Sequence, residues 1–482
     1  MVLLLLILIP LAAALATLLA GKATRTFEAI AAVAALGEAA LVAVITAQVG
    51  REGRCGFDSL LAVDALGTIV LLTVAVVGVA AAFYSMGYLR EEVRKQIIGL
   101  RRVKQYFVLF HLFLMAMFFA VSTVNPIMMW IAIEATTLST AFLISFYSKS
   151  SSMEAAWKYL IINSIGLLLG FFGTLLFMTA TRDLPADLLV NWQVLLANAS
   201  RLDPLVAKIA FIFALIGYGT KAGLVPMHTW LPDAYSKAPS PISALSSGAL
   251  MNVAVLAILR FKMVTDKAID PHFSQNLMIF FGVVSVVVAA FIMFPQRNYK
   301  RLFAYSSIEH VGILALGFGF GGLGAFAALL HMIYHSLSKS ILFYSAGNVL
   351  IKFGSTKIAN IKGLLPALPL TGLILILGFL SITGTPPFGM FLTEVYILTA
   401  GMAAHPAVVV TVIAMLALVF IGFLRHIVAM TFSKSAEPLP AGEANLMTTL
   451  PPVILLSTLI IIGVVVPEPL KALLESAASF IR

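Results

Sequence analysis

The 482-residue chain is 61% hydrophobic and only 11% charged, with a mean hydropathy of +1.04. A soluble domain needs far more surface charge, so the composition excludes one and predicts an all-α, polytopic membrane protein. The net charge of +10 does not indicate nucleic-acid binding, because membrane proteins concentrate Lys and Arg in their cytoplasmic loops. The single cysteine, Cys55, excludes an internal disulfide and an iron–sulfur cluster held by this chain alone.

Apolar segments long enough to cross ~30 Å of hydrocarbon recur along the whole sequence, about fourteen of them by that criterion. Seven are expected in the first half, at Val2–Ala20, Phe27–Val49, Leu60–Ser85, Gln105–Thr123, Pro126–Tyr147, Glu154–Ala180 and Leu205–Pro226. Seven follow, at Pro241–Phe261, Asn276–Phe294, Arg301–Phe318, Leu323–Val349, Leu368–Leu398, Ala407–Phe432 and Pro451–Val466. No soluble domain fits between them, so residues 1–482 form one membrane domain.

Lys and Arg are distributed unevenly between the two sets of alternating loops. The set that begins with Lys22 and Arg25, and includes the basic segment Arg90–Lys104, contains 18 of the 31. The opposite set and the C-terminus contain ten, and three lie within spans: Lys158, Lys221 and Lys339. Because the basic loops are cytoplasmic in most membrane proteins, both termini are predicted outside. The basic segment is expected to meet anionic lipid headgroups.

Ionisable side chains inside the spans are the candidate functional residues, because a charge at bilayer depth costs at least ~2.5 kcal/mol. Asp64 lies near a membrane surface, where an interfacial cap is the favoured role. Glu134 follows Pro126 by eight residues, which places it about 12 Å into its helix. It is a candidate proton carrier or a static, paired acid. Lys158 lies near its helix start and either joins the path or snorkels to the interface.

Lys221 lies in an apolar helix that Pro226 is expected to interrupt. A broken helix is tolerated in a membrane only where protein buries it or it lines a wet cavity. Lys221 and Glu134 have opposite charges and comparable depth, so an ion pair between them is expected to lower the insertion cost of both. Such a pair also couples their protonation, as a pump element requires.

Beyond the break, polar side chains continue at His228, Asp233 and Asn252. His228 is either a relay member or a structural hydrogen-bond donor. Asn252 lies at mid-membrane, where it holds water but carries no charge. These residues and Lys158 are secondary candidates, as are Glu309 and His310, which stand side by side within a later span.

His331, His335 and Lys339 follow at i, i+4 and i+8, on one face of one helix. Water can bridge the ~6 Å steps between them, so they are candidate relay residues. The alternative is a set of hydrogen-bonded core histidines. A metal site is disfavoured, because the spacing offers no third ligand and no HExxH glutamate.

A second break is expected at Pro386 and Pro387, followed by Glu394. Two Gly/Pro-interrupted helices in corresponding positions of two halves indicate inverted repeats with the ion path at the breaks. The domain therefore divides into peripheral N-terminal helices (1–104), a first repeat (105–261), a second repeat (276–432) and a C-terminal helix (433–482).

Several segments together resemble the antiporter-like proton-translocating subunits of respiratory complex I, Mrp cation antiporters and group 4 membrane-bound hydrogenases. They are TKAGLVPMHTWLPDAYSKAPSPISALSSG, AYSSIEHVG, HSLSKSILFYSAG and GTPPFG, with Glu134. The resemblance covers residues 60 to 450, and the run from Glu134 to Gly166 is most similar to the F branch of the hydrogenase-4 subunits. It implies fourteen helices, two inverted five-helix repeats and a central chain of charged residues and water.

The resemblance also implies roles. Glu134 maps to the coupling glutamate, Lys221 to its lysine partner, His335 and Lys339 to the central relay, and Glu394 to the exit residue. Many relatives carry a central lysine or histidine where this sequence has Asn252. The relay is therefore expected to rely on water, His331, His335 or Lys339 at that point.

Taken together, the sequence predicts a proton-translocating subunit without a redox centre or cofactor of its own. We expect it in the plasma membrane of a prokaryote, with membrane subunits and a peripheral hydrogenase, formate- or NADH-linked redox arm as partners. A Na⁺/H⁺ antiporter is the alternative within transport, since a carboxylate-lined wet path passes either ion. A structural membrane scaffold with static buried pairs is the alternative of another class.

Overall fold

The computed structural model describes residues 1–21, 23–180, 190–434 and 439–481; Lys22, part of the first basic loop, lies outside them. The first half contains α1 (Val2–Leu19), α2 (Thr24–Glu52), β1 (Arg54–Phe57), β2 (Leu61–Asp64), α3 (Ala65–Arg94), α4 (Leu100–Ser122), α5 (Pro126–Ile144), α6 (Ser150–Thr179), α7 (Trp192–Ala197), α8 (Pro204–Ala222) and α9 (Leu231–Lys237). The second contains α10 (Ser240–Leu245), α11 (Met251–Ala268), α12 (Pro271–Met293), α13 (Tyr299–Phe320), α14 (Leu323–Phe353), α15 (Leu364–Ala367), α16 (Pro369–Ile382), α17 (Gly389–Met402), α18 (Pro406–Thr431), α19 (Leu446–Val464) and α20 (Glu468–Ala478).

Twelve helical segments in the described ranges are long and apolar enough to cross a membrane, which confirms an all-α, polytopic membrane protein. One of the twelve, Ser240–Ala268, joins α10 to α11 through a π-helical turn at Ser246–Leu250. Each of the twelve overlaps one predicted span. Two predicted spans remain. Leu323–Val349 lies within α14, a 31-residue helix that is not among the twelve, and Leu368–Leu398 is filled by two shorter apolar helices, α16 and α17.

The third predicted span, Leu60–Ser85, is wrong at both ends. Its first residues form β2, which pairs antiparallel with β1 in a short hairpin. Asp64 then caps α3 by accepting the N–H of Gly67 (2.9 Å), and it binds both terminal nitrogens of Arg260 at 2.5 and 2.7 Å. The interfacial-cap interpretation of Asp64 is therefore confirmed. At its other end α3 runs on to Arg94, so the predicted basic loop Arg90–Lys104 is largely helical.

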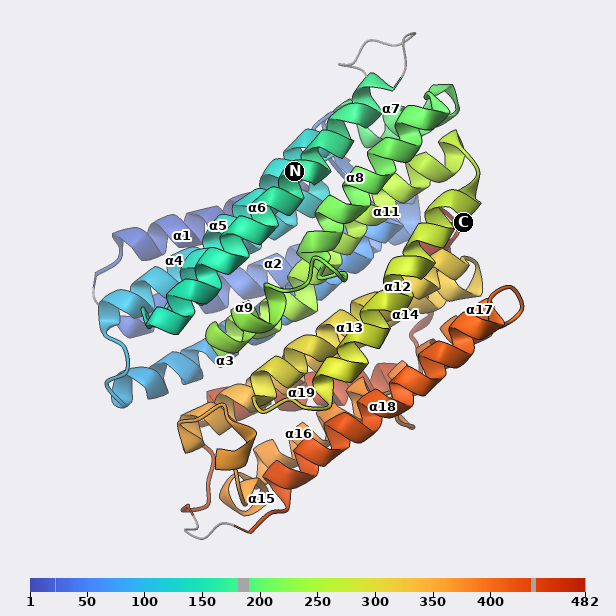
Figure 1. Ribbon diagram of the computed structural model, residues 1–482. Helices are drawn as coiled ribbons and strands as arrows, with labels where there is room; N and C mark the ends of the chain where they lie inside the picture. Colours follow the sequence, from blue (N-terminus) through green and yellow to red (C-terminus); the bar gives the residue numbers. More distant parts are fainter. Residues whose placement is uncertain (22, 181–189, 435–438, 482) are drawn as a thin grey trace.

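Burial separates the central helices from the peripheral ones. The most apolar 18-residue stretches of Ser240–Ala268 and of α13 are entirely buried, whereas those of α1, α2 and α18 are mostly accessible. Figure 1 shows the helices running roughly along a common direction, with α12 and α13 between the α4–α6 group and the α16–α18 group. Side chains on α13 and its neighbour α14 are therefore shielded from lipid.

Glycines allow two pairs of neighbouring helices to approach closely. A β-carbon at Gly217 of α8 would overlap the backbone of Gly170 in α6. In the second pair, β-carbons at Gly282 of α12 and Gly312 of α13 would each lie 2.8 Å from the other's carbonyl oxygen. Small residues at such contacts are the usual means of close helix packing in membranes. They bring α6 to α8, and α12 to α13, close enough for short polar side chains to meet.

Candidate functional site

The first helix break lies next to Lys221, but it begins at a glycine rather than at the predicted Pro226. α8 ends at Ala222, and Gly223 adopts φ 94°, the left-handed conformation that favours glycine. Its N–H bonds back to the carbonyl of Gly219 (2.9 Å), which is glycine capping of a helix end. Pro226 follows in the turns that lead to α9. Lys221 therefore occupies the last turn of a helix that ends inside the protein.

The ammonium group of Lys221 is held by neutral hydroxyl groups. Lys221 is 1% exposed, and its Nζ donates to Thr137 Oγ1 of α5 and to the Tyr159 hydroxyl of α6, both at 2.8 Å. The same Nζ lies 4.9 Å from the centre of the Tyr159 ring, close enough for a cation–π interaction. A buried ammonium normally needs such partners, because its desolvation is costly.

The prediction of an ion pair between Glu134 and Lys221 is wrong, because a bridging hydroxyl group separates the two side chains. Glu134 Oε1 accepts from Ser164 (2.8 Å) and Oε2 from Thr137 (3.3 Å), and the Thr137 hydroxyl lies between the two charged groups. A hydroxyl group accepts one bond and donates another, so it bridges them. The two side chains also differ in burial, because Glu134 is only partly buried whereas Lys221 is 1% exposed. The pair is coupled through one side chain rather than by contact.

Lys158 and Asp233 do not join this buried group. Lys158 is 49% exposed and pairs with Glu154 at 2.6 Å and with Asp233 at 3.5 Å. Asp233 also binds Arg301 of α13. These four residues form an ion cluster at one end of the bundle that ties α6 and α9 to α13. Of the two interpretations of Lys158, the structure favours the interfacial one.

His228 and Asn252 are buried, but within the described residues neither forms a hydrogen bond with Lys221 or Lys339. His228 lies beyond the break with its ring 6.4 Å from that of Tyr305, and its Nδ1 has no hydrogen-bond partner among the described residues. The amide nitrogen of Asn252 donates to Thr73 of α3 (3.2 Å) and to Ser336 of α14 (2.8 Å). Asn252 thus meets α14 at the residue that follows His335.

A set of serines links the π-helical turn before Asn252 to α13, which sequence reasoning missed. Ser247, in the π-helical turn, hydrogen bonds to Ser307 of α13 at 2.8 Å. The neighbouring Ser306 accepts from Lys339. On the other side, Ser246 lines one small gap together with Thr140 and Tyr159. We call Ser246, Ser247, Ser306 and Ser307 the serine seam. A π-helical turn inside a helix often marks a functional site, and SALSSG was the available signal.

The second helix break brings Glu394 against the broken backbone. α16 ends at Ile382, Gly384 adopts φ 58°, and α17 begins at Gly389, so the break spans the predicted Pro386 and Pro387. A β-carbon at Gly384 would overlap the Glu394 carboxylate, so any larger residue there would require that side chain to move. Glu394 is 8% exposed and lies in the continuation after the break, as predicted.

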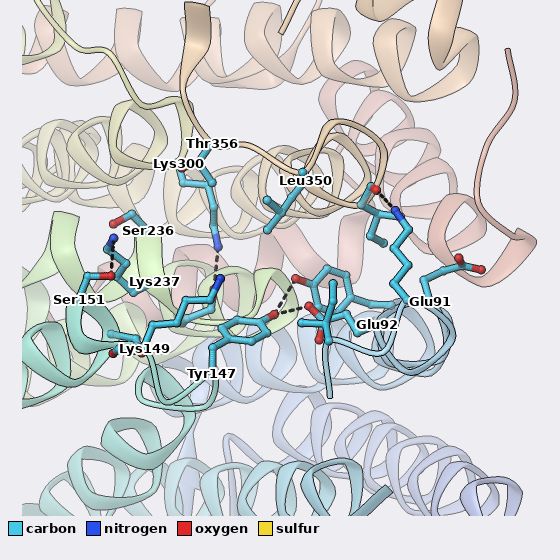
Figure 2. A pocket seen from close by; sticks show the side chains of 17 residues that line it. Glu91, Glu92, Tyr147, Lys149, Ser151, Ser236, Lys237, Lys300, Leu350 and Thr356 are labelled. Carbon is cyan, nitrogen blue, oxygen red and sulfur yellow. Dashed lines mark hydrogen bonds between the residues drawn. The ribbon is translucent and has the colours of Figure 1, made fainter. Parts of the chain in front are cut away.

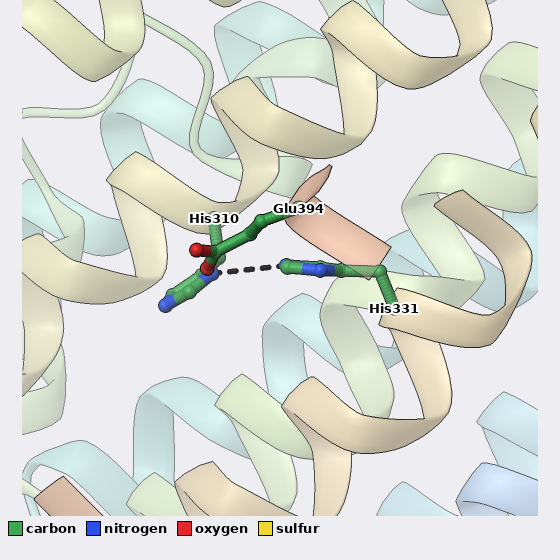
Figure 3. Close-up of side chains that lie close together, drawn as sticks. All are labelled: His310, His331 and Glu394. Carbon is green, nitrogen blue, oxygen red and sulfur yellow. Dashed lines mark hydrogen bonds between the residues drawn. The ribbon is translucent and has the colours of Figure 1, made fainter. Parts of the chain in front are cut away.

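Three helices converge on Glu394 to form a short chain of polar side chains. His310 Nδ1 lies 3.0 Å from His331 Nε2, and His331 Nδ1 lies 2.9 Å from Thr393 Oγ1, the residue before Glu394. Figure 3 shows His310, His331 and Glu394 pointing toward one another from α13, α14 and α17. All three are buried. His310, only a secondary candidate on sequence grounds, is therefore as central as His331.

The same chain continues from His310 towards Lys339. Glu309 is 2% exposed, with its carboxylate 3.8 Å from His310 Nε2. The ring centre of His335 lies 5.2 Å from that of His310, and neither of its nitrogens has a hydrogen-bond partner in the described ranges. Lys339 donates to Phe303 O (2.9 Å) and to Ser306. Unpartnered polar atoms in a buried site commonly bind ordered water.

The His310, His331 and Glu394 group also has the composition of a metal site. One ligand atom from each lies within 4.8 Å of the others, and two histidines with a carboxylate are a known zinc-ligand set. The sequence pointed only to His331 and His335 as potential ligands, because Glu394 is remote in the chain. That the protein needs no metal stays a prediction.

Three further side chains gather in a cavity of about 320 Å³ that sequence reasoning did not identify. Glu92, Tyr147 and Lys300 face it from α3, from the segment after α5 and from α13 (Figure 2). Of the three, Glu92 lies in the segment LREEVRKQ, and the predicted end of the span at Ser85 places that segment in a solvated basic loop.

These features define a class: a polytopic membrane protein with buried, hydrogen-bonded charges beside two broken helices. The family model described as NADH:quinone oxidoreductase/Mrp antiporter, transmembrane, matches residues 123–421. The chain belongs to this family of antiporter-like, proton-translocating subunits, as the sequence resemblance implied.

Individual relatives agree. A hydrogenase-4 component F homolog of Methylacidiphilum infernorum is 41% identical over 349 residues, 71% of this chain and 73% of the relative. The NADH-quinone oxidoreductase subunit N of Desulforudis audaxviator is 29% identical over 490 residues, 96% and 94% of the two chains. One chain of an archaeal membrane-bound sulfane sulfur reductase superposes with a TM-score of 0.86 at 26% identity, covering 100% of this chain and 97% of that one.

Proposed function

We propose that this chain moves protons across the plasma membrane of a prokaryote. The route runs from Lys221 through the serine seam to Lys339, and then through His310 and His331 to Glu394. The Glu134–Thr137–Lys221 group acts as the gate. When Lys221 loses its proton, the Thr137 hydroxyl turns to donate to the neutral amine, and its bond to Glu134 breaks. Protonation at one site thereby changes the partners at the other.

The observation that best supports this proton route is the environment of Lys221. Its ammonium is buried and held by two hydroxyl groups rather than by a touching carboxylate. A directly paired lysine is fixed in its charged form by its partner, whereas hydroxyl groups accept from the ammonium and donate to the amine. A lysine in this setting can exchange its proton, which suits a gate better than a static structural pair.

The test is a Lys221→Ala variant. The purified full-length chain is placed in liposomes, a K⁺ diffusion potential is set with valinomycin, and an entrapped pH dye reports proton entry. Lys221→Ala is expected to lower the rate by about a hundredfold, the lower range for loss of a proton-transfer group. The exposed Lys158→Ala is the matched control and should keep the wild-type rate. A folded Lys221→Ala variant with wild-type flux would refute the proposal.

The proposal also includes the protein complex in which this chain works. The relatives named as hydrogenase-4 component F and as quinone oxidoreductase subunit N favour a multi-subunit oxidoreductase that supplies the driving force. The partners would be further membrane subunits and a peripheral redox arm. The basic loops favour both termini outside. A C-terminal tag, purified without harsh detergent, should retain these partners, and protease digestion of the tag in whole cells reports the side.

The same liposomes separate the alternatives. Proton flux that requires Na⁺ on the opposite side would indicate a Na⁺/H⁺ antiporter. A scaffold subunit would show no flux above protein-free liposomes, and Glu394→Gln would then reduce assembly of the complex without changing the protons moved per assembled complex.

A further inference from the structure

A cavity of about 320 Å³ opens at the end of the bundle where the basic loops lie. Its charged lining residues are Glu91, Glu92, Lys95, Lys149, Lys237 and Lys300. Figure 2 shows Glu92 beside Tyr147, with Lys149 from the first half and Lys300 from the second half of the chain near them. The volume is ample for several water molecules, and the lining is polar enough to hold them.

Glu92 is the buried acid of this cavity. It is 4% exposed, and its Oε1 accepts from the Tyr147 hydroxyl at 2.5 Å. Tyr147 in turn shares a 2.9 Å hydrogen bond with the hydroxyl of Tyr88. The second oxygen, Oε2, has no hydrogen-bond partner within the part of the chain that the structure describes. A buried carboxylate oxygen without a partner, on the wall of a wet cavity, is free to bind a proton or a water molecule.

Lys300 faces the same cavity from the first turn of α13. It is 1% exposed, and its Nζ donates to the carbonyl of Ala238 at 2.7 Å. One helical turn further along α13, the carbonyl of Phe303 accepts from Lys339 at 2.9 Å. Positions i and i+3 lie roughly 5 Å apart along a helix face. The backbone of Lys300, whose side chain lines the cavity, and the carbonyl that holds Lys339 therefore lie one turn apart on α13.

We propose that Glu92 is the proton-loading site of this chain and that Lys300 passes the proton on to Lys339. This inference rests on the proposed function and adds a loading site to it, while Lys221 remains the gate that the whole flux requires. The Glu92 carboxylate binds a proton from cavity water and becomes a carboxylic acid. It gives that proton through water to the neutral amine of Lys300 and returns to carboxylate, and the resulting ammonium passes a proton towards Lys339. No electron moves, and only O–H and N–H bonds form and break.

The surroundings distinguish Glu92 from an ordinary surface acid. Its neighbour Glu91 forms a 2.5 Å ion pair with the exposed Arg94 and also accepts from Asn445. Glu28, at the same end of the bundle, is held by both nitrogens of Arg90. Those acids are structural anchors with fixed cations, whereas Glu92 lines the cavity and is held by a hydroxyl group rather than by a cation.

The first test is Glu92→Gln in the liposome assay described for Lys221. The expected result is a loss of proton flux of about tenfold or more, with partial recovery in Glu92→Asp, which restores the acid. Glu154→Gln is the matched control, because Glu154 is an exposed acid at the same end of the bundle and lies outside the cavity. A folded Glu92→Gln variant with wild-type flux would overturn the proposed loading site.

This failure is distinguishable from failure of the proposed function. Flux that survives Glu92→Gln but is lost in Lys221→Ala and Glu394→Gln would remove only the loading site. Proton flux that survives all three variants would refute the proposed route itself.

A second measurement does not depend on the stability of Glu92 variants. Ser236 lines the cavity and is 7% exposed, so a thiol there is reached through the cavity. In a Cys55→Ser background, Ser236→Cys is treated with a small, charged methanethiosulfonate reagent. Labelling should block proton flux, whereas labelling of Glu154→Cys should not. Complete labelling of Ser236→Cys without loss of flux would overturn the proposal.

Discussion

Lys221 and Glu134 are joined through a single side chain, because Thr137 Oγ1 accepts a 2.8 Å hydrogen bond from the lysine and lies 3.3 Å from the glutamate. A direct ion pair would be held by Coulomb attraction at short range, which falls off slowly with small movements. A hydroxyl bridge is directional, and it depends on which group donates. The link between the two charges therefore responds to a single proton.

This relationship predicts that Thr137→Val uncouples the two charges. Valine has nearly the same shape but no hydroxyl, so Lys221 keeps only Tyr159 as a hydrogen-bond partner. Loss of one such bond costs about 1–3 kcal/mol when a buried charge is left short of a partner. Proton flux should fall by about tenfold or more, as measured with the pH dye in liposomes.

Thr137→Ser provides the control, because serine keeps the hydroxyl and should retain most of the flux. Thr174→Val is a second control, since Thr174 forms a comparable bond with Tyr218 between α6 and α8, away from both charges. Equal loss of flux in the Thr137→Val and Thr174→Val variants would contradict the bridge and indicate a packing effect.

Much of the fold follows from local sequence. Twelve predicted spans match long helices, because the length of an apolar run is fixed by the thickness of the hydrocarbon. Glu394 is also found after a break, as expected. The break near Pro226 starts earlier, at Gly223, because a left-handed glycine ends a helix before a proline can. The sequence therefore predicts this helix break correctly but places it a few residues too late.

The sequence could not determine which buried charges touch. Lys158 and Lys221 both lie in apolar segments, yet only Lys221 is buried, because α6 presents Lys158 at its exposed first turns. The Glu92 cavity was missed for a related reason: α3 continues past its apolar run, and contacts with Tyr147 bury the acid. These outcomes depend on helix rotation and packing, which hydropathy does not encode.

The serine seam predicts a non-additive pair of mutations. If a proton crosses from the π-helical turn to α13 at the Ser247–Ser307 bond, changing either serine to alanine should lower the proton flux severalfold. The double variant should then lose little more flux than either single variant. Ser338→Ala is the matched control, because Ser338 forms the same kind of 2.8 Å bond with Ser381. The liposome assay measures all four variants. Wild-type flux in the double variant would place the crossing elsewhere.

Gly384→Ala should displace Glu394. Alanine at φ 58° costs about 1–2 kcal/mol in any setting, and here its β-carbon would also overlap the Glu394 carboxylate. Gly53→Ala is the matched control, because Gly53 has φ 74° and nothing within 4 Å of the added carbon. Both variants should lose similar thermal stability, but only Gly384→Ala should lose proton flux. Equal flux in the two variants would show that Glu394 tolerates displacement.

Asp64 should make the folded protein less stable at acidic pH. Burial works against its charge, but Arg260 and the N–H of Gly67 outweigh burial and hold the pKa of this carboxyl below its ordinary value. On acidification the unfolded chain therefore binds a proton at Asp64 before the folded chain does. The stabilisation is complete above the ordinary pKa of aspartate and is lost as the pH falls through the lower folded value.

Asp64→Asn should accordingly lower the unfolding free energy at pH 7 by about 1–3 kcal/mol, between the values for exposed and for buried ion pairs. At pH 3 the difference from wild type should shrink, because the wild-type pair is then weakened as well. Thermal unfolding in detergent micelles at the two pH values measures this. Asp203→Asn is the control, since Asp203 caps α8 through the N–H groups of Leu205 and Val206 in the same way that Asp64 caps α3. A difference for Asp64→Asn that stays constant from pH 7 to pH 3 would show that the Arg260 pair does not stabilise the fold.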